Sequence, residues 1–337
     1  MAEHSRLTEA LVRTNFEAFV KKALRRQRNE KLDNQPYVSY ICSTISQFID
    51  GKINRLLINL PPQHLKSFVG SVCLAAYLLG KDPRLRILLV AYGDGLAKQL
   101  CDEVRDLMRS EWYSRSFETR IREDHSRSGD FKTREGGGVF ATLATGAITG
   151  RAADVVLYDD PHEISDWNDD RKLDLVKDNL TTLLSRLNDK VRGSMIVVAH
   201  RVSDNDLSSH LLQQSGWEYL QLPLIAVATQ TYDLGHEQWT REEGTLLRPT
   251  AYDPSDIEFL QRTQKSPPFD LLYQQGLGPR SGLTARREDF QCFNKFTILN
   301  CPVVLSIDPG QSGATNASRS VIQIGRASCR ERVLVAV

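Results

Sequence analysis

The sequence lacks the features that mark several common protein classes. Its 337 residues carry 43 lysines and arginines against 42 aspartates and glutamates, so no overall basic excess marks a nucleic-acid binder, although a local patch is compatible with this balance. The six cysteines form no C-x-x-C pair, which would indicate zinc or redox chemistry. No signal peptide opens the chain, and no apolar run has membrane-spanning length. We therefore expect a cytosolic protein with buried thiols.

Two kinds of apolar pattern alternate along the first 200 residues. The length allows two domains, or one large domain with an appendage. Short apolar runs predict buried strands at residues 55–60, 86–91, 154–158 and 194–199. Helical periodicity predicts helices at residues 7–28, 38–50, 68–79, 95–109 and 170–188. This alternation is typical of an α/β fold with a parallel sheet.

The remaining segments are less periodic. Residues 114–138 are polar and end in three glycines, which predicts a loop, and residues 139–145 alternate as a strand would. Prolines and glycines are frequent between residues 223 and 300, which predicts a linker or small subdomain. We expect one short helix there, near residues 255–265, with Ser255 or Asp256 as its cap.

The stretch Leu56–Ser67 (LLINLPPQHLKS) joins an apolar strand, two prolines and a Lys-Ser pair to a following apolar helix. That layout is typical of a phosphate-binding loop, because a helix amino terminus offers free N–H groups to an anion. Lys66 would reach the terminal phosphates, and the Ser67 hydroxyl would bind Mg²⁺. The glycines of the pattern G-x-x-x-x-G-K-[ST] are missing, since leucines stand at Leu60 and Leu65. An ordinary strand–turn–helix connection explains these residues equally well.

A second apolar run ends in two adjacent carboxylates, Asp159 and Asp160, followed by Pro161. At the carboxyl edge of a parallel sheet, acids lie where ligands bind. One carboxylate can hold Mg²⁺, and its neighbour can orient or deprotonate an attacking water. An Asp-Asp-Pro turn is also an ordinary way to end a strand. Because the Lys-Ser loop and the acidic pair follow strands of the same predicted sheet, together they favour nucleotide hydrolysis.

Two further strands end in polar residues. The run at 194–199 is followed by His200 and Arg201, and a polar residue there can sense a γ-phosphate and pass its state onward. A surface cation near a loop is the alternative interpretation of Arg201. The run Pro302–Ile307 ends in Asp308, with a possible hairpin partner at Ser320–Ile324. An acid at this place begins a two-metal nuclease of the ribonuclease-H-like class, although one aspartate is not a metal site.

Taken together, these motifs resemble the large terminase subunit of tailed bacteriophages, the motor that packages DNA into the capsid. The Pro-Pro-x-His-x-Lys-Ser loop combined with Ile-Thr-Gly-Arg and Asp-Asp-Pro is more specific than any single motif. The matching stretches run in order along nearly the whole chain, at Arg55–Ser67, Ala91–Ala97, Ile148–Asp154, Tyr158–Pro161, His200–Arg201 with Asp204–Leu207, and Leu272–Gln275.

The resemblance implies a P-loop NTPase fold of the ASCE type, with a parallel sheet flanked by helices. It implies an ATPase domain at residues 1–225, a linker subdomain at 226–300 and the start of a ribonuclease-H-like nuclease domain at 301–323. It implies ATP and Mg²⁺ as cofactors. Its partners would be double-stranded DNA, the portal protein and the small terminase subunit, within a homo-oligomeric ring. The protein would act in the cytoplasm of the infected bacterial host, without membrane attachment and without being a stable virion component.

The resemblance also implies roles for individual residues. Asp160 would activate water, Arg201 would lie in the segment that couples hydrolysis to DNA movement, and Arg151 would be an arginine finger. Metal would be bound by Ser67, Asp159 and, as the first nuclease ligand, Asp308. The nucleotide would be bound by Pro62, Gln63, His64, Leu65, Lys66 and Ser67.

The loop departs from the family pattern at two positions. The family sequence Pro-Pro-Arg-His-Gly-Lys-Ser has an arginine where this chain has Gln63 and a glycine where it has Leu65. Loss of the arginine removes a cation that can stabilise transition-state charge. Loss of the glycine predicts a strained backbone or a reshaped phosphate cradle. We expect nucleotide binding to survive and hydrolysis to be slow, so that Gln63→Arg combined with Leu65→Gly raises turnover.

The end of the sequence departs as well. The family's nuclease domain needs further carboxylates, and only Glu331 follows Asp308. Residues 324–333 resemble the translation of a common sequencing adapter. We therefore expect the native sequence to end near Gln323, residues 324–337 to be a non-native tail, and this chain to lack nuclease activity.

Two other functions remain open at this point. A helicase-like ATPase of another family would show further motifs in a second ATPase-like domain, and residues 223–300 do not supply them. A non-hydrolysing assembly module of the terminase fold is favoured by Leu65 and disfavoured by Lys66, Asp159 and Asp160.

Overall fold

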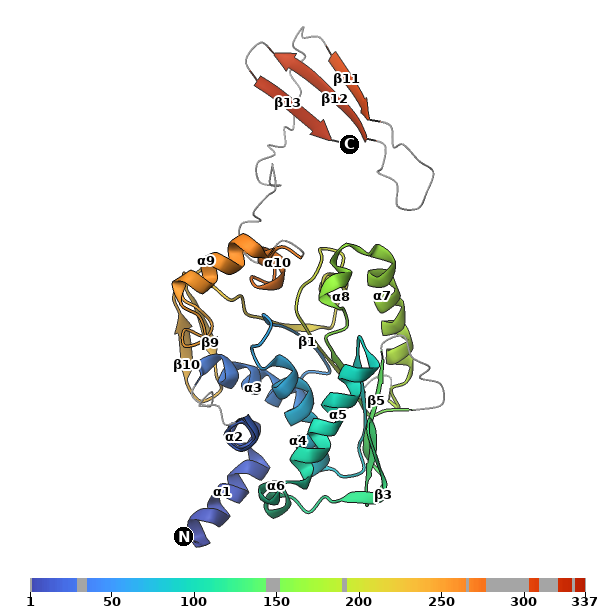
Figure 1. Cartoon of the computed structure of the whole chain (residues 1–337), viewed down its shortest axis with the longest axis vertical. Helices are drawn as coiled ribbons and strands as arrows, with labels where there is room; N and C mark the ends of the chain where they lie inside the picture. The colour runs from blue at the N-terminus through green and yellow to red at the C-terminus, as the bar shows by residue number, and fades with distance from the viewer. Residues whose placement is uncertain are drawn as a thin grey trace. The chain divides into compact units, whose positions relative to one another are not determined.

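The chain forms two compact units, Met1–Ser281 and Gly282–Val337, which Figure 1 shows in the computed structural model. The first unit holds a mixed sheet with helices on both faces, and the second holds a small antiparallel sheet. Among the described residues, no helix is both long enough and apolar enough to cross a membrane. The structure describes residues 2–28, 35–143, 152–189, 193–264, 267–276, 303–308, 321–328 and 331–336.

The sheet of the first unit has eight strands, in the order β3-β4-β5-β2-β6-β7-β1-β8. Only β3 and β4 are antiparallel to their neighbours, and every other pairing is parallel. Strand β1 precedes the Lys-Ser loop, and strand β6 leads into the acidic pair. Only β7 lies between these two strands in the sheet. This confirms the predicted α/β class. The strands are β1 (Arg55–Asn59), β2 (Arg86–Ala91), β3 (Ile121–Arg127), β4 (Asp130–Thr133), β5 (Gly138–Leu143), β6 (Val155–Asp159), β7 (Ser194–Ala199) and β8 (Glu218–Gln221).

Helices cover both faces of the sheet, which is why its central strands are apolar at successive positions. Leu56 and Ile58 of β1 pack among the amino-terminal helices, whereas Leu57 points to the opposite face. The first face is covered by α1 (Ala2–Thr14), α2 (Phe16–Ala23), α3 (Pro36–Ile49), α4 (Leu74–Lys81), α5 (Asp94–Arg109) and α6 (Glu111–Ser116). The opposite face is covered by α7 (Asp170–Ser185) and α8 (Leu207–Leu212).

Two predictions about local structure were wrong. The single helix expected at residues 7–28 is broken at Asn15, because the Asn15 side chain accepts a hydrogen bond from the Ala18 N–H at 2.8 Å and caps α2. The expected loop at 114–138 contains the second half of α6 and the strands β3 and β4. Strand β3 lies at the sheet edge, and its alternation is hidden by charged residues such as Arg122 and Asp124, which pair with each other.

The segment after β8 belongs to the first unit and contains a hairpin and two short helices. Its small apolar cluster comprises Leu224, Ile257 and Phe269. The hairpin pairs β9 (Gln230–Asp233) with β10 (Gln238–Arg241), and the helices are α9 (Pro254–Thr263) and α10 (Phe269–Leu272). The expected helix is α9, but its predicted cap was wrong. Asp253 caps it, because Pro254 takes the first helical position and the Asp253 carboxylate accepts from two backbone N–H groups.

The second unit contains three antiparallel strands, β11 (Val303–Asp308), β12 (Val321–Ser328) and β13 (Glu331–Ala336). The predicted hairpin of β11 with the segment near Ser320–Ile324 is confirmed by the pairing of β11 with β12. The domain boundaries at residues 225, 300 and 323, and the foreign origin of residues 324–337, stay predictions.

Candidate functional site

The structure brings the Lys-Ser loop and the acidic pair together at the carboxyl ends of β1, β7 and β6. Lys66 Nζ lies 2.9 Å from Asp160 Oδ2. The Ser67 hydroxyl donates a hydrogen bond to Asp159 Oδ1 at 2.7 Å. Residues 92 positions apart in the sequence therefore form one polar cluster, as parallel strands that end at a common edge require.

Asp159 is completely buried and receives two hydroxyl hydrogen bonds. The second comes from Ser71 to Oδ2, and Ser71 lies four residues after Ser67 in the π-helical segment Phe68–Cys73, which Ser67 precedes as the N-cap residue and which continues into α4. Burial raises the pKa of Asp159 to about 7, with a further contribution from the neighbouring Asp160 charge. Ser71 was not predicted as a site residue, although its four-residue spacing from Ser67 places both hydroxyls on one helix face.

The raised pKa of Asp159 predicts that stability falls with rising pH. The ordinary value for an aspartate is 3.8, so between pH 3.8 and about pH 7 the folded state binds the additional proton. The free energy of unfolding should therefore decrease across this range, and Asp159→Asn should remove that decrease. Urea denaturation with EDTA present, from about pH 4 to about pH 8, measures it. Equal pH slopes for the two proteins would contradict the assignment.

Asp160 has the opposite electrostatic environment. Although burial raises its pKa, the Lys66 ammonium and the neighbouring His200 lower it below the usual range. His200, at the end of β7, places Nδ1 2.9 Å from Asp160 Oδ1. Asp160 is therefore ionised wherever the protein is folded near neutral pH, and it can accept a hydrogen bond or a proton from water. The backbone of Asp160 has φ 38°, a left-handed conformation that aspartate tolerates better than most residues.

Two non-glycine residues of the loop have the positive φ angles that glycine usually adopts. Leu65 has φ 61° at the position where the family pattern has glycine, and Gln63 has φ 62°. A left-handed conformation costs a non-glycine residue roughly 1–2 kcal/mol. The expectation of a strained backbone at Leu65 is therefore confirmed. Pro62 is half-buried and Gln63 is exposed, whereas Lys66 is only 8% exposed.

Comparing two substitutions at Leu65 isolates this strain. Leu65→Gly and Leu65→Ala both remove the packing of the half-buried leucine, but only glycine relieves the positive φ. We expect the glycine variant to be the more stable of the two by about 1 kcal/mol in urea denaturation. At Leu60, which has no positive φ, alanine should be the more stable residue. If the alanine variant is the more stable at Leu65 as well as at Leu60, the backbone of Leu65 is not strained.

His64 is buried beneath the loop and is neutral. Its Nδ1 donates to the Pro62 carbonyl at 2.8 Å, so Nε2 carries the lone pair. Burial lowers the pKa of His64 to about 4, and the cations Arg248, Lys66 and Arg241 lower it further. The His64 ring stacks on Tyr252, with ring centroids 6.0 Å apart and planes 7° apart. The segment after β10 therefore packs against the loop, a contact that the sequence pattern did not predict.

Arg201 is held by Asp206 and its neighbours. Its Nε donates to Asp206 Oδ2 at 2.8 Å, and Nη2 donates to the Ser209 hydroxyl at 2.6 Å. Both partners of this ion pair are buried. The Arg201 N–H donates to Gln275 Oε1 at 3.2 Å, which ties the end of β7 to the segment after α10. In this arrangement Arg201 positions the turn before α8, and its predicted role in coupling stays a prediction.

For two other predicted site residues, Arg151 and Asp308, the structure gives no side-chain position relative to this cluster. Arg151 lies outside the described residues. Asp308 is the last residue of β11, in the second unit, and only its backbone is described. Within the described ranges, no group of three or more His, Cys, Asp or Glu side chains could hold a metal alone. The oxygen donors of Ser67 and Asp159 fit Mg²⁺, which is usually held by one or two carboxylates together with substrate phosphates.

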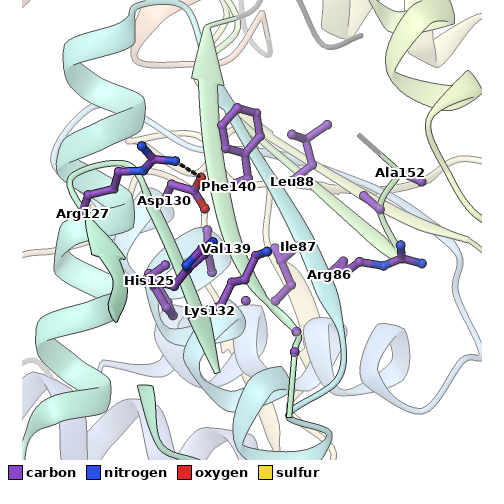
Figure 2. Close-up of a pocket in the computed structure, with 15 residues that line it drawn as sticks. Arg86, Ile87, Leu88, His125, Arg127, Asp130, Lys132, Val139, Phe140 and Ala152 are labelled. Carbon is purple, nitrogen blue, oxygen red and sulfur yellow. Dashed lines mark ion pairs between the residues drawn. The ribbon is translucent and has the colours of Figure 1, made fainter. Parts of the chain in front are cut away.

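A separate cavity of about 360 Å³ opens at the opposite end of the sheet, where β2 and β5 begin (Figure 2). Its rim carries Arg86, Arg127 and Lys132, with Asp130 paired to Arg127. None of the predicted site residues whose side chains the structure describes lines it. The polar cluster around Lys66 is therefore distinct from this cavity.

A scan against protein-family models finds no match to this chain, and a search of curated proteins finds none. The search of solved structures finds the large terminase of bacteriophage HK97, with 14% identity, a TM-score of 0.40, and coverage of 54% of this chain and 38% of that protein. It also finds the large terminase ATPase domain of Thermus phage P74-26, with 12% identity, a TM-score of 0.37, and coverage of 66% and 88%. Each of these structures is a large terminase or the ATPase domain of one, and the chain covers 38% of the HK97 protein.

Proposed function

We propose that this chain is an ATP-hydrolysing motor subunit of the large terminase type. The observation that carries the proposal is the polar cluster at the sheet edge, in which Lys66 contacts Asp160 and Ser67 contacts Asp159. A cation, a hydroxyl and two carboxylates at the start of a helix are the groups that phosphoryl transfer needs, since this chemistry depends on positioning and charge stabilisation.

Each residue has a defined task in this proposal. Lys66 exchanges Asp160 for the terminal phosphates, and the helix that follows presents its N–H groups to them. Ser67 and Asp159 would hold Mg²⁺, which would neutralise phosphate charge. Asp160, ionised and next to His200, orients the attacking water and accepts its proton.

The wider role rests on the sequence resemblance. In this proposal the motor moves viral double-stranded DNA into the procapsid as a homo-oligomeric ring, with the portal protein and the small terminase subunit as partners. It works in the cytoplasm of the infected bacterium. Endonuclease activity, for which Asp308 would be the first metal ligand, is expected only in a protein with an intact nuclease domain.

The test is Mg²⁺-ATP binding by the full chain beside Lys66→Ala, measured by titration calorimetry. We expect the variant to bind roughly 10- to 100-fold more weakly, since it loses a charge-assisted contact to phosphate. Lys98→Ala is the matched control, because Lys98 is a half-exposed lysine of α5 that pairs with Asp94. Equal affinity in wild type and Lys66→Ala would contradict the nucleotide site.

Turnover separates the motor from a non-hydrolysing assembly module, which the strained Leu65 favours. Hydrolysis that Lys66→Ala abolishes supports the motor. The assembly module is supported by two results together. Wild type binds ATP without hydrolysing it, and the double variant Gln63→Arg with Leu65→Gly does not hydrolyse it either.

A further inference from the structure

Among the described residues, two side chains contact the carboxylate of Asp160, one at each oxygen. Lys66 Nζ lies 2.9 Å from Oδ2, and His200 Nδ1 lies 2.9 Å from Oδ1. The His200 contact is short but poorly aligned, because neither Nδ1 nor Oδ1 makes a well-directed hydrogen bond to a described residue. The carboxylate is therefore paired at one oxygen and only closely approached at the other.

The backbone of Asp160 is fixed on both sides. Its N–H donates to the Val198 carbonyl of β7 at 2.7 Å, and its carbonyl accepts from the N–H of Tyr92, directly after β2, at 3.2 Å. The residue therefore cannot shift as a whole, whereas its carboxylate can turn about the side-chain bonds. A change of partner would re-aim the two oxygens and leave the strand ends in place.

His200 is held as firmly at the end of β7. The Ala199 carbonyl accepts from the Leu60 N–H at 3.2 Å, and the Arg201 N–H donates to Gln275 Oε1 at 3.2 Å. The residues before and after His200 are thus tied to the end of β1 and to the segment after α10. The side chain is only 8% exposed. Its ring is therefore a fixed reference for the neighbouring carboxylate.

Nucleotide binding would remove one of the two partners of Asp160. In the proposed function Lys66 leaves this carboxylate for the terminal phosphates, and His200 is then its remaining partner among the described residues. A buried carboxylate without a donor is costly. Catalytic hydrogen bonds that are poorly aligned in a free enzyme often tighten when the substrate binds. His200 is the donor already within reach.

We propose that His200 is the positioning residue that takes over the Asp160 carboxylate when Lys66 moves to the nucleotide. Its Nδ1–H then donates to Oδ1 and fixes the carboxylate plane, so that Oδ2, released by Lys66, faces the attacking water. Asp160 remains the base, and His200 acts through it by orientation. This inference rests on the proposed ATPase function and concerns the same site.

Two substitutions of similar shape separate hydrogen-bond donation from packing. Asparagine places an amide N–H near the position of imidazole Nδ1, whereas leucine has the same branched outline without a donor. His200→Leu should lower kcat for ATP by about 10- to 100-fold, and His200→Asn should stay within roughly threefold of wild type. Calorimetric affinity for Mg²⁺-ATP should stay within roughly threefold in both. Equal kcat values in the two variants would overturn the proposal, because packing alone gives asparagine no advantage.

The ring proton of His200 gives a readout that does not depend on turnover. We expect its Nδ1–H signal in the proton NMR spectrum to lie further downfield with Mg²⁺-AMP-PNP, a non-hydrolysable ATP analogue, than without it. His200→Leu assigns the signal by its loss. If wild type binds the analogue and no downfield signal develops, the exchange of partners is wrong while the nucleotide site stands. If wild type does not bind the analogue, the proposed ATPase function is rejected, and this inference with it.

His162→Leu is the matched control for the loss of a buried histidine. The His162 ring is also buried, and its Nε2 accepts from the Leu207 N–H at 2.9 Å. This variant should keep the downfield signal and a kcat within roughly threefold of wild type. An equal loss of kcat in His162→Leu and His200→Leu would overturn a specific role of His200. Thermal unfolding followed by tryptophan fluorescence verifies that each variant is folded.

Discussion

Replacing Asp160 with asparagine should lower ATP turnover by about 10²- to 10⁴-fold while leaving Mg²⁺-ATP affinity within a few-fold of wild type. Asp160 is the carboxylate that contacts both Lys66 and His200, and these neighbours keep it ionised. Asparagine has the same shape but cannot accept a proton. It also tolerates the left-handed backbone at this position, so the loop geometry should survive.

Steady-state phosphate release measures the turnover, and calorimetry measures the affinity. Asp154→Asn is a matched control, because Asp154 immediately precedes β6 at its opposite end and accepts a hydrogen bond from the Arg86 N–H at 2.8 Å. It should leave turnover unchanged. Wild-type turnover in Asp160→Asn would show that another group activates water, and an equal loss in Asp154→Asn would point to a general effect on folding.

The parts of the site that were predicted from the sequence are those set by strand ends. Continuous apolar runs identified β1 and β6, and parallel strands bring their carboxyl ends to one edge. That is why Lys66 and Asp160, far apart in the sequence, could be expected together. The conformation of Leu65 was also predictable, since a glycine position in a turn keeps its backbone requirement when another residue occupies it.

The parts that were missed depend on packing between segments with no shared pattern. Tyr252 reaches His64 across nearly two hundred residues, and no periodicity in either segment signals that contact. Strand β3 was missed because an exposed edge strand can carry charges on both sides of its alternation. Strand β4, between β3 and β5, has only four residues, which is too short for its alternation to stand out. The partner of Arg201 was hidden for a similar reason, because an aspartate five residues later is as typical of a helix cap as of an ion pair.

Removing the Asp206 carboxylate, the partner of Arg201, should be the most destabilising of the single substitutions considered in the first unit. Asp206→Ala should lower the free energy of unfolding by about 3–5 kcal/mol, because it leaves the buried Arg201 charge without a counterion. The Asp206 carboxylate also accepts from the N–H groups of Val202 and Ser209, at 3.0 and 2.9 Å, and so caps α8. The loss of the cap adds to the loss of the ion pair.

Urea denaturation followed by tryptophan fluorescence measures this effect in the first unit alone, since all four tryptophans lie within Met1–Ser281. Arg201→Met combined with Asp206→Leu should recover part of the stability, because an apolar pair leaves no buried charge unpaired. The exposed pair of Arg122 with Asp124 is the control, and Asp124→Ala should change stability by less than about 1 kcal/mol. If Asp206→Ala costs no more than this surface change, Arg201 does not depend on Asp206, and its guanidinium is free for the coupling role that the sequence resemblance implies.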